Sequence, residues 1–557
     1  MSFPFAAWLF GYKPAWWRAD LMAGLTAAAV VIPQAMAYAA VAELPVETGL
    51  YCALAAMLVY PLLGSSRPLS VTTTSSIAML TASEVAAVTD AHPTIAATSM
   101  AATLALMVGV ILIAARILRL GFLANFISKP VLVGFQAGVG VAIVVGQLKA
   151  VLGVSATSKT TLGILAALPG LLPHAHLPTL FIAAIGIGVL LAGSRLWPRA
   201  PTPLAWVAIT IAASAALGLS RMGVATIGLV PAGLPHLATP DLSLVAYLWP
   251  GALGIALMAF TESMAAARTF RSDSDRPVET NAELVANGAA NVAAAFAGGM
   301  PAGGGTSQTA VVDQMGARSQ MAQWVDAAAV VVTLLALSGV IGLMPKAALA
   351  AVIVATGISM IKPATFSAIG RIRLDELSWA VASVAGVIAF GTLDGILLAV
   401  VVSLLTLGYQ IDHPPVYAMT YDREDDVFRR ARPGESHEAL PGLLALGTQG
   451  SLSFANAGWV HDRLGALVKE AHPKIIVLEC SAIPDIEYTA LLMLIESERM
   501  LRAAGVELWL AAVNPDLQRI LDRSPLAEAL GPDRFFLTLG KAAMAWRRRG
   551  GVTAKTA

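Results

Sequence analysis

Long apolar segments fill the first 410 residues of the chain and constrain its fold more than any other feature. A helix needs about 17–25 apolar residues to cross a bilayer. Besides the long segments named at the end of this paragraph, two segments near 70–88 and 306–317 are shorter and polar at their starts. Only 13% of all residues are charged, against about 25% in soluble domains. The sequence predicts an α-helical polytopic membrane protein of about fourteen transmembrane segments, whose long segments begin near Ala19, Glu47, Thr94, Pro130, Thr179, Pro203, Tyr247, Asn281, Gln323, Pro345, Asp375 and Thr392.

The basic residues indicate how these segments are oriented. Loops on the cytoplasmic side of a membrane protein carry an excess of Lys and Arg. With a cytoplasmic N-terminus, inward loops would carry most of them, including Arg67 and Arg371, and outward loops only a few, such as Lys149 and Lys346. We therefore expect a multi-pass protein of the cell (inner) membrane with both termini in the cytoplasm.

The chain changes character after Gln410, where charged residues become frequent. Apolar segments then alternate between helical and strand periods, which is typical of a small α/β domain. The predicted organisation is an N-terminal interfacial segment at 1–18, a transmembrane domain at 19–410, a linker at 411–437 and a cytoplasmic α/β domain at 438–550. A net charge of +1 gives no sign of nucleic-acid binding, and the two cysteines, Cys52 and Cys480, suggest no disulfide or metal cluster. No cofactor is expected.

Three short matches suggest an internal repeat. "VIPQAMAYA" (31–39) resembles "AFTESMAAA" (259–267), "PVET" occurs at 45–48 and 277–280, and "TTTS" (72–75) resembles "TSQT" (306–309). They predict a 7+7 arrangement, with repeat 1 at about 19–220 and repeat 2 at about 245–410. An odd number of spans in each repeat makes the two repeats inverted, which is typical of transporters.

The third segment of each repeat contains "GSSRPLSVTTTSS" (64–76) or "GGMPAGGGTSQT" (298–309). Each predicts an extended stretch followed by a short helix that begins inside the membrane. The free N–H groups and dipole of such a helix end attract anions. Thr73 and Thr74 in the first segment, and Ser307 and Gln308 in the second, are predicted to bind the substrate. Glycines 303–305 would let the backbone approach a ligand closely.

Three other interpretations of these segments stay open to different degrees. A phosphate-binding P-loop requires a Lys after its glycines, and none follows here. An external loop is possible. Threonines at a helix start also cap helices that bind no ligand.

Glu262 lies well inside an apolar segment, at the position that matches Gln34 in the first repeat. A carboxylate at membrane depth costs about 2.5–3.5 kcal/mol and by default marks an ion pathway. We predict that Glu262 couples transport to protons, with a structural pair to Arg268 as the alternative. Gln34 and Tyr38, four residues apart on one helix face, are expected to line the cavity. Glu84 and Asp326 are expected to reach the membrane interface.

These residues together resemble the SulP (sulfate permease) family of anion transporters. The resemblance rests on "DLMAGLTAAAVVIPQAMAYAAVAELPVETGLY" (20–51) and "NAELVANGAANVAAAFAGGMPAGGGTSQTAVVDQMGARSQ" (281–320). In the tail, "GSLSFANA" (450–457) and "IPDIEYTALLML" (483–494) are similar to STAS domains. The resemblance implies an anion site between the third and tenth helices, a homodimer, and elevator-like movement of a core domain against a gate domain.

The chain departs from the family pattern at several positions. Many relatives have a Gly-Pro pair where this chain has "TTTSS" (72–76), and animal relatives can carry an arginine near Ser307 and Gln308. Helix ends and hydroxyls would therefore have to hold the anion. The tail has Glu487-Tyr488-Thr489 where phosphorylated STAS relatives show Asp-Ser-[Ser/Thr], which argues against serine phosphorylation there.

The sequence thus predicts secondary active transport of a small inorganic oxyanion or carboxylate, of the sulfate, bicarbonate or dicarboxylate class, driven by protons through Glu262. Sodium coupling is the closest alternative, although Ala266, one turn after Glu262, offers no oxygen ligand. A passive anion channel or exchanger stays open. The STAS-like tail argues against a nucleobase transporter, and the lack of an intramembrane Ser/His or metal-ligand pairing argues against a membrane enzyme. A signalling receptor whose output is the STAS domain is a further alternative.

Overall fold

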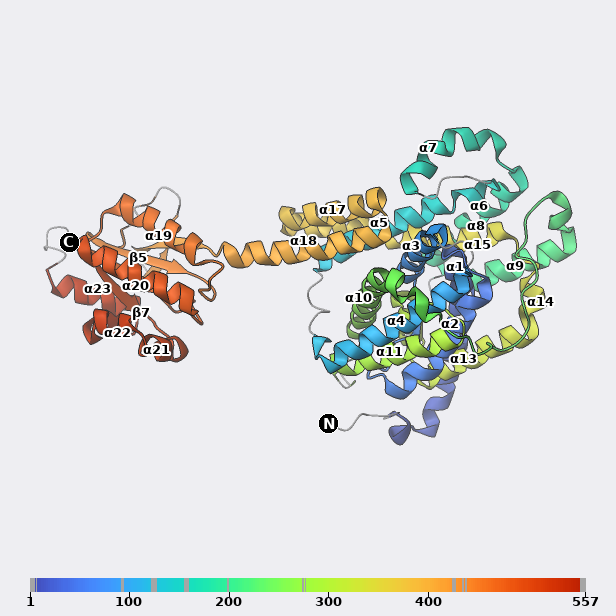
Figure 1. The fold of residues 1–557 in the computed structure, drawn as a ribbon, viewed down its shortest axis with the longest axis horizontal. Helices are drawn as coiled ribbons and strands as arrows, with labels where there is room; N and C mark the ends of the chain where they lie inside the picture. The colour runs from blue at the N-terminus through green and yellow to red at the C-terminus, as the bar shows by residue number, and fades with distance from the viewer. Residues whose placement is uncertain are drawn as a thin grey trace. The chain divides into compact units, whose positions relative to one another are not determined.

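The computed structural model describes residues 6, 8–91, 95–121, 128–154, 160–197, 200–272, 275, 277–422, 427–432, 435 and 438–550. It divides into two compact units, Met1–Ser403 and Leu404–Ala557. Each unit is described by itself (Figure 1).

The first unit is built from helices. Those of its first half are α1 (Trp17–Val41), α2 (Val46–Leu63), α3 (Ser75–Ala91), α4 (Ala97–Ile117), α5 (Lys129–Gly146), α6 (Leu148–Leu152), α7 (Thr161–Leu171), α8 (Leu177–Leu196) and α9 (Thr202–Leu217). Those of its second half are α10 (Val245–Thr269), α11 (Thr280–Phe296), α12 (Thr306–Gln314), α13 (Met321–Val332), α14 (Ser338–Ile341), α15 (Lys346–Met360), α16 (Pro363–Ile372), α17 (Leu374–Phe390) and α18 (Thr392–Asp412), which continues into the second unit. A π-helical turn, Thr333–Leu337, joins α13 to α14.

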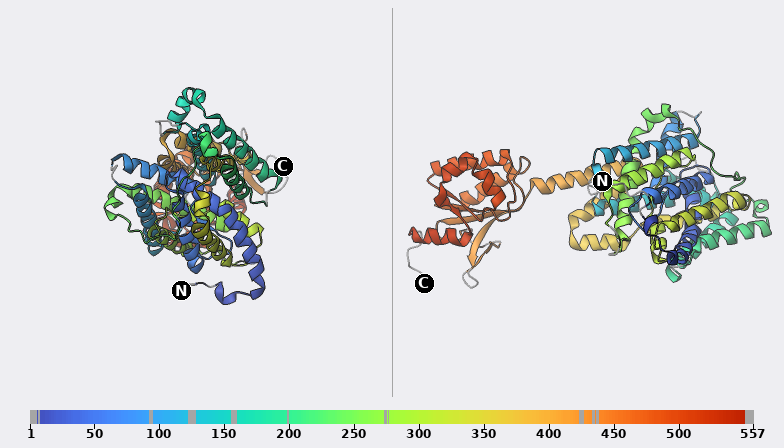
Figure 2. Two further views of the ribbon diagram at one scale, coloured as in Figure 1. Left: turned by 90° about the vertical axis from the view of Figure 1, so that its right-hand side faces the viewer. Right: turned by 90° about the horizontal axis from the view of Figure 1, so that it is seen from below.

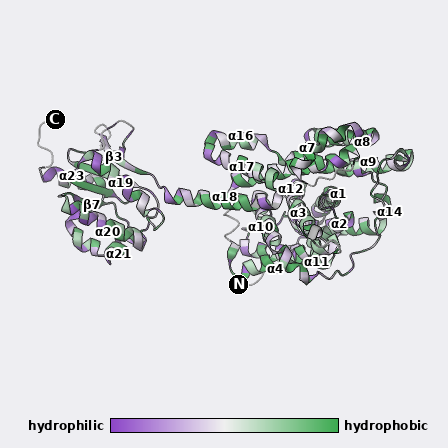
Figure 3. Cartoon of the chain, turned by 45° about the horizontal axis from the view of Figure 1, so that its top comes forward, coloured by the Kyte–Doolittle hydropathy of each residue, from purple (hydrophilic) through white to green (hydrophobic). Residues whose placement is uncertain are grey.

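Hydrophobic side chains dominate these helices (Figure 3). Among the described residues, eight helical stretches are long and apolar enough to cross a membrane, and four shorter apolar helices accompany them. Neither α12 nor the 17-residue helices α11 and α17 belong to these eight. The total of about fourteen spans therefore stays a prediction.

The helices pack in two groups. The first helix group contains α1–α4 and α10–α13, and the second contains α5–α9 and α15–α17. Within the first group α4 and α11 run side by side (Figures 1 and 2). A Cβ atom added to Gly109 of α4 would lie 2.7 Å from the Gly288 carbonyl oxygen of α11. Gly140 of α5 and Gly357 of α15 make the equivalent approach in the second group, at 2.5 Å. Small residues at these crossings let the backbones meet.

The two groups meet where α1 contacts α9 and α15, and where α3 contacts α5. A cavity of about 930 Å³ lies along this boundary. Side chains of both groups line it, including Val41 and Ser83 from the first group and Lys149, Lys346 and Val387 from the second.

The helix bounds agree with an internal repeat. Both α1 and α10 have 25 residues, and each bound of α10 lies 228 positions after that of α1 (245 − 17 and 269 − 41). The same shift relates Gln34 to Glu262. The lengths of α1 and α10 thus agree with the predicted repeat, whereas α3 with 17 residues and α12 with 9 differ in length.

The second unit is a six-stranded sheet covered by helices, with strand order β4-β3-β5-β6-β7-β8. Strands β5 to β8 are parallel, whereas β3 pairs antiparallel with both β4 and β5. Alternate residues of a strand face opposite sides of a sheet. Leu444 and Leu446 accordingly pack in one hydrophobic cluster, and Leu443 and Ala445 in another that includes Trp509. The strands are β3 (Val416–Asp422), β4 (Val427–Arg430), β5 (Leu443–Thr448), β6 (Ile475–Glu479), β7 (Glu507–Ala511) and β8 (Phe535–Phe536).

Five helices accompany this sheet: α19 (Ala457–Ala471), α20 (Tyr488–Ala503), α21 (Pro515–Leu521), α22 (Pro525–Leu530) and α23 (Leu539–Arg548). The alternation of strands and helices expected for 438–550 is observed. The stretch expected to be a linker, 411–437, contributes β3 and β4 to the sheet. Residues 423–426, 433–434 and 436–437 of that stretch lie outside the described residues.

Candidate functional site

The two predicted breaks lie against each other in the first helix group. β1 (Val71–Thr72) and β2 (Gly303–Gly304) form an antiparallel pair in which Val71 faces Gly304 and Thr72 faces Gly303. α3 begins three residues after β1, and α12 begins two residues after β2. Because the strands are antiparallel, the two helices leave the pair in opposite directions, and their N-terminal ends flank it.

The glycines of β2 serve packing. A Cβ atom on Gly303 would lie 2.6 Å from Ile77 Cδ1 of α3, and one on Gly304 would lie 2.8 Å from Ser263 Cα of α10. The sequence suggested that these glycines let the backbone approach a ligand. At these two positions the structure corrects that expectation, because the absent side chains make room for α3 and α10.

The three threonines of the first segment have different partners. The Thr72 hydroxyl donates to Gln308 Oε1 at 2.8 Å and thereby joins the two broken segments. The Thr74 hydroxyl donates to Glu262 Oε2 at 2.7 Å. Thr73 is fully buried, and its hydroxyl has no partner among the described residues. Thr74 also accepts a long hydrogen bond, 3.4 Å, from the Ile77 N–H group, so capping and carboxylate binding coexist there.

Glu262 is buried in α10, about two turns before the C-terminal end of that helix, and faces the break. Its carboxylate accepts from Thr74, and Ser76 of α3 and Gln136 of α5 also neighbour it. Arg268, the alternative partner, lies in the exposed last turn of the same helix. The sequence alone did not single out Gln136, although it is a lone polar residue within an apolar helix.

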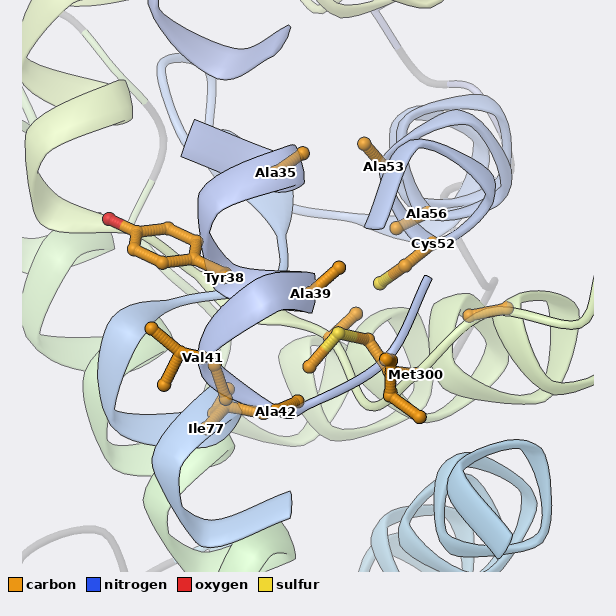
Figure 4. Packing of buried hydrophobic residues seen from close by; sticks show 14 of the residues in the cluster. Ala35, Tyr38, Ala39, Val41, Ala42, Cys52, Ala53, Ala56, Ile77 and Met300 are labelled. Carbon is orange, nitrogen blue, oxygen red and sulfur yellow. The ribbon is translucent and has the colours of Figure 1, made fainter. Parts of the chain in front are cut away.

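Tyr38 and Gln34 lie on α1 and are both buried. The Tyr38 ring points away from Cys52 and Ala53 of α2, toward which Ala35 and Ala39 turn (Figure 4). The Tyr38 hydroxyl neighbours Ser75 of α3 and Thr356 of α15. Tyr38 therefore lies where both helix groups meet.

The Gln34 amide oxygen is buried and has no hydrogen-bond partner among the described residues. Unpaired buried polar groups are costly and in native proteins usually have a ligand or water as a partner. The Ser75 hydroxyl donates to Met360 Sδ of α15 at 3.3 Å. Polar groups from both helix groups thus surround the N-terminal end of α3.

The two predicted substrate-binding residues at the start of α12 lie in different environments. Ser307 is exposed, whereas Gln308 is buried and bonded to Thr72. Thr309 is buried as well, and its hydroxyl accepts from the Ser70 N–H group at 3.1 Å. No side chain caps α12 at Gly305. The first N–H groups of α12 consequently remain as donors for a ligand.

Other buried carboxylates lie outside this site. Glu84 and Asp326, expected near the interface, are both buried. Neither carboxylate oxygen of Asp326 has a hydrogen-bond partner among the described residues. Glu283 of α11 is fully buried and extensively hydrogen-bonded. The described residues contain no group of three or more His, Cys, Asp and Glu side chains suited to a metal ion.

The 930 Å³ cavity is separate from the helix ends. It touches α3 at Met79, Ser83 and Ala86, one to three turns beyond the start of that helix. The helix ends have the unpaired donors and the buried carboxylate, so they are the stronger candidate site. The cavity lies along the same boundary between the two helix groups.

Residues 17–382 match the sulfate permease family, and residues 436–542 match the STAS domain. The chain belongs to the sulfate permease family. This is a family of anion transporters, and its members are membrane-embedded multi-pass proteins, not enzymes. The family prediction made from the sequence motifs is thereby confirmed.

Curated relatives extend over nearly the whole chain. A probable sulfate transporter of Mycobacterium tuberculosis is 35% identical over 551 residues, covering 97% of each protein. Sulfate transporter 3.2 of Arabidopsis thaliana is 28% identical and covers 98% of this chain and 88% of its own length. Both relatives are named sulfate transporters, and the match covers most of the length of each.

Solved structures share the fold. Murine Solute Carrier 26 family member A9, an anion transporter in an inward-facing state, superposes with a TM-score of 0.88 at 21% identity and covers 98% of this chain and 94% of its own. The transmembrane domain of the cyanobacterial bicarbonate transporter BicA gives a TM-score of 0.60 at 23% identity, covering 71% and 98%. The predicted helical membrane domain followed by a STAS domain is confirmed at the level of the fold.

Proposed function

We propose that this protein is a secondary active transporter for a small inorganic oxyanion or carboxylate, and that Glu262 couples transport to protons. The observation that carries the proposal is the 2.7 Å hydrogen bond between Glu262 and Thr74, at the start of the broken helix α3. A carboxyl group and a hydroxyl can keep such a bond in either protonation state, because the hydroxyl can donate or accept. Protonation of Glu262 would therefore change the charge beside the N-terminal end of α3, where the anion would bind.

The anion would bind between the N-terminal ends of α3 and α12. Free N–H groups and helix dipoles at these ends attract negative charge without a fixed cation. Thr73, Ser307 and the Gln308 amide nitrogen would supply neutral donors, and Gln34 and Tyr38 would close the site from α1. Sulfate is the first candidate because the curated relatives carry that name.

Movement would follow the boundary between the two helix groups. The first helix group carries both broken segments, so it can move as a body against the second in an elevator-type cycle. The cavity along this boundary and the contacts of Tyr38 with both groups support that interpretation. We further propose a homodimer in the inner membrane, with both termini in the cytoplasm.

Uptake into proteoliposomes tests the proposal. Full-length protein is reconstituted, and sulfate uptake is measured under an inward proton gradient or an inward sodium gradient. We expect the proton gradient to accelerate uptake and the sodium gradient to have no effect. A sodium requirement without a pH response would favour sodium coupling. The same assay with bicarbonate in place of sulfate tests a sodium-coupled bicarbonate symporter, the second candidate, which the likeness to the bicarbonate transporter BicA motivates. Conductance without saturable uptake would indicate a passive channel.

A further inference from the structure

A row of three buried polar side chains runs along α11. Glu283, Asn287 and Asn291 follow one another at intervals of four residues, so they share one face of the helix, and all three are fully buried. Polar side chains within a membrane helix are costly unless they are hydrogen-bonded, and they usually have a function. The proposed transport site uses none of the three.

Glu283 holds the stretch that leads into β1. Its carboxylate accepts from the Ser65 N–H group and from the Ser65 hydroxyl, each at 2.8 Å, and from the Tyr60 hydroxyl at 3.0 Å. Ser65 lies six residues before Val71, the first residue of β1. One end of the row therefore fastens the first broken segment.

Asn291 holds the stretch that leads into β2. Its Oδ1 atom accepts from the Ala302 N–H group at 2.9 Å, and its Nδ2 atom donates to the Ala302 carbonyl oxygen at 2.9 Å. This two-bond pairing satisfies the backbone of Ala302 as a neighbouring strand would. The other end of the row therefore fastens the second broken segment, one residue before Gly303.

Asn287 connects the row to α10. Its Oδ1 atom lies 2.8 Å from the Ser263 hydroxyl, whose other acceptor is the Ala259 carbonyl oxygen at 2.6 Å. The same hydroxyl accepts from the Gly304 N–H group at 2.7 Å. The residue before Ser263 in α10, Glu262, accepts from Thr74. Consecutive residues of α10 thus hold the two broken segments, Ser263 on β2 and Glu262 at α3.

We propose that Glu283, Asn287, Asn291 and Ser263 are positioning residues that set the distance between the N-terminal ends of α3 and α12. The inference rests on the proposed function, because that distance determines how well an anion fits. In this arrangement Glu283 is a fixed hydrogen-bond acceptor and exchanges no proton during transport. A misplaced pair of helix ends would bind the anion weakly while Glu262 continued to respond to protons.

The test compares Ser263→Ala with Thr261→Val in the full-length protein. Both changes remove one buried hydroxyl from α10, but within the described part of the chain Thr261 donates only to its own helix, to the Leu257 carbonyl oxygen at 2.7 Å. Sulfate uptake gives KM, maximal rate and the pH of half-maximal rate for each variant. We expect Ser263→Ala to raise KM for sulfate about tenfold with an unchanged pH midpoint, and Thr261→Val to stay within twofold of the parent.

Glu283→Gln and Asn291→Leu extend the test to the two ends of the row. Both are expected to raise KM without moving the pH midpoint. A pH midpoint that moves in Glu283→Gln would overturn the inference, because Glu283 would then titrate during transport. A lower Tm with an unchanged KM in Ser263→Ala would overturn it too, since the row would then serve stability alone. If Asn291→Leu fails to fold, Ser263→Ala decides by itself.

The proposed function and this inference fail in different ways. Absence of sulfate uptake by the unmodified protein contradicts the proposed sulfate transport. Normal uptake by the unmodified protein, with Ser263→Ala indistinguishable from Thr261→Val, contradicts the positioning role and leaves transport intact.

Discussion

The two broken segments occupy equivalent places in the two repeats but are built from different residues. The first segment has bulky, hydroxyl-bearing residues at its break, and Thr72 and Thr74 use their hydroxyls on Gln308 and Glu262. The second has Gly303 and Gly304 at its break, which lack side chains and press against α3 and α10. The comparison suggests that the first segment responds to the coupling group, whereas the second is held in place by its neighbours.

Glu262→Gln gives the largest expected effect, because it removes the carboxylate that accepts from Thr74 at the start of α3. We expect at least a 90% loss of proton-driven sulfate accumulation. Sulfate exchange should persist in part, since the amide can still bond to Thr74. Accumulation and counterflow are measured in the same vesicles, with Thr261→Val as the control. Normal accumulation would remove Glu262 from the coupling mechanism.

Gly304→Ala tests whether the second segment depends on close packing. The added Cβ atom would meet Ser263 Cα at 2.8 Å, which forces a backbone shift. Overpacking of this kind lowers the free energy of unfolding by about 1–3 kcal/mol. We expect a lower Tm and a KM for sulfate raised at least tenfold. Gly146→Ala is the matched control, because its Cβ atom would meet nothing within 4 Å. Equal behaviour of the two variants would contradict the packing role of β2.

Thr74→Val tests the response of the first segment to the coupling group. Valine keeps the shape of threonine but leaves the buried Glu262 carboxylate without its hydroxyl donor. Such a loss costs about 1–3 kcal/mol. We expect the pH midpoint of uptake to move while KM for sulfate changes less than in Gly304→Ala. An unmoved midpoint together with a large rise in KM would mean that Thr74 acts on the anion and not on Glu262.

Ser307→Ala should have the smallest effect, because the exposed hydroxyl is one donor among several N–H groups at the start of α12. A change of about threefold in KM is expected, since one neutral hydrogen bond contributes about 0.5–1.5 kcal/mol. Ser307→Leu, which fills the space instead, should abolish sulfate binding in a thermal-shift titration. Binding by the leucine variant would place the anion elsewhere.

The sequence predicted the breaks well because glycines, a proline and threonines are conspicuous within apolar segments. It also singled out Glu262, since a carboxylate in a long apolar helix is rare, and the structure places this carboxylate against Thr74. Gln136 and Thr356 were missed because they come from α5 and α15, and only tertiary packing brings these helices to the break. The row on α11 was visible as polar residues spaced by four in "NAELVANGAANV" (281–292), but its partners, Ser65, Ser263 and Ala302, follow only from the fold.

The role of the glycines shows a second limit of sequence reasoning. A glycine makes room for whatever lies nearest, and the sequence does not say whether that is a ligand or a helix. Here Ile77 and Ser263 occupy the space beside Gly303 and Gly304. Likewise, the burial of Glu84 and Asp326 depends on which helices cover them, which distance from a helix end does not reveal.

The most direct test of the account is the position of a bound oxyanion. A cryo-EM map of the purified protein with selenate, an electron-rich analogue of sulfate, would locate it. We predict density between the N-terminal ends of α3 and α12, in contact with Thr73 and Ser307. Selenate density confined to the cavity beside Lys149 and Lys346, with the helix ends empty, would contradict the account.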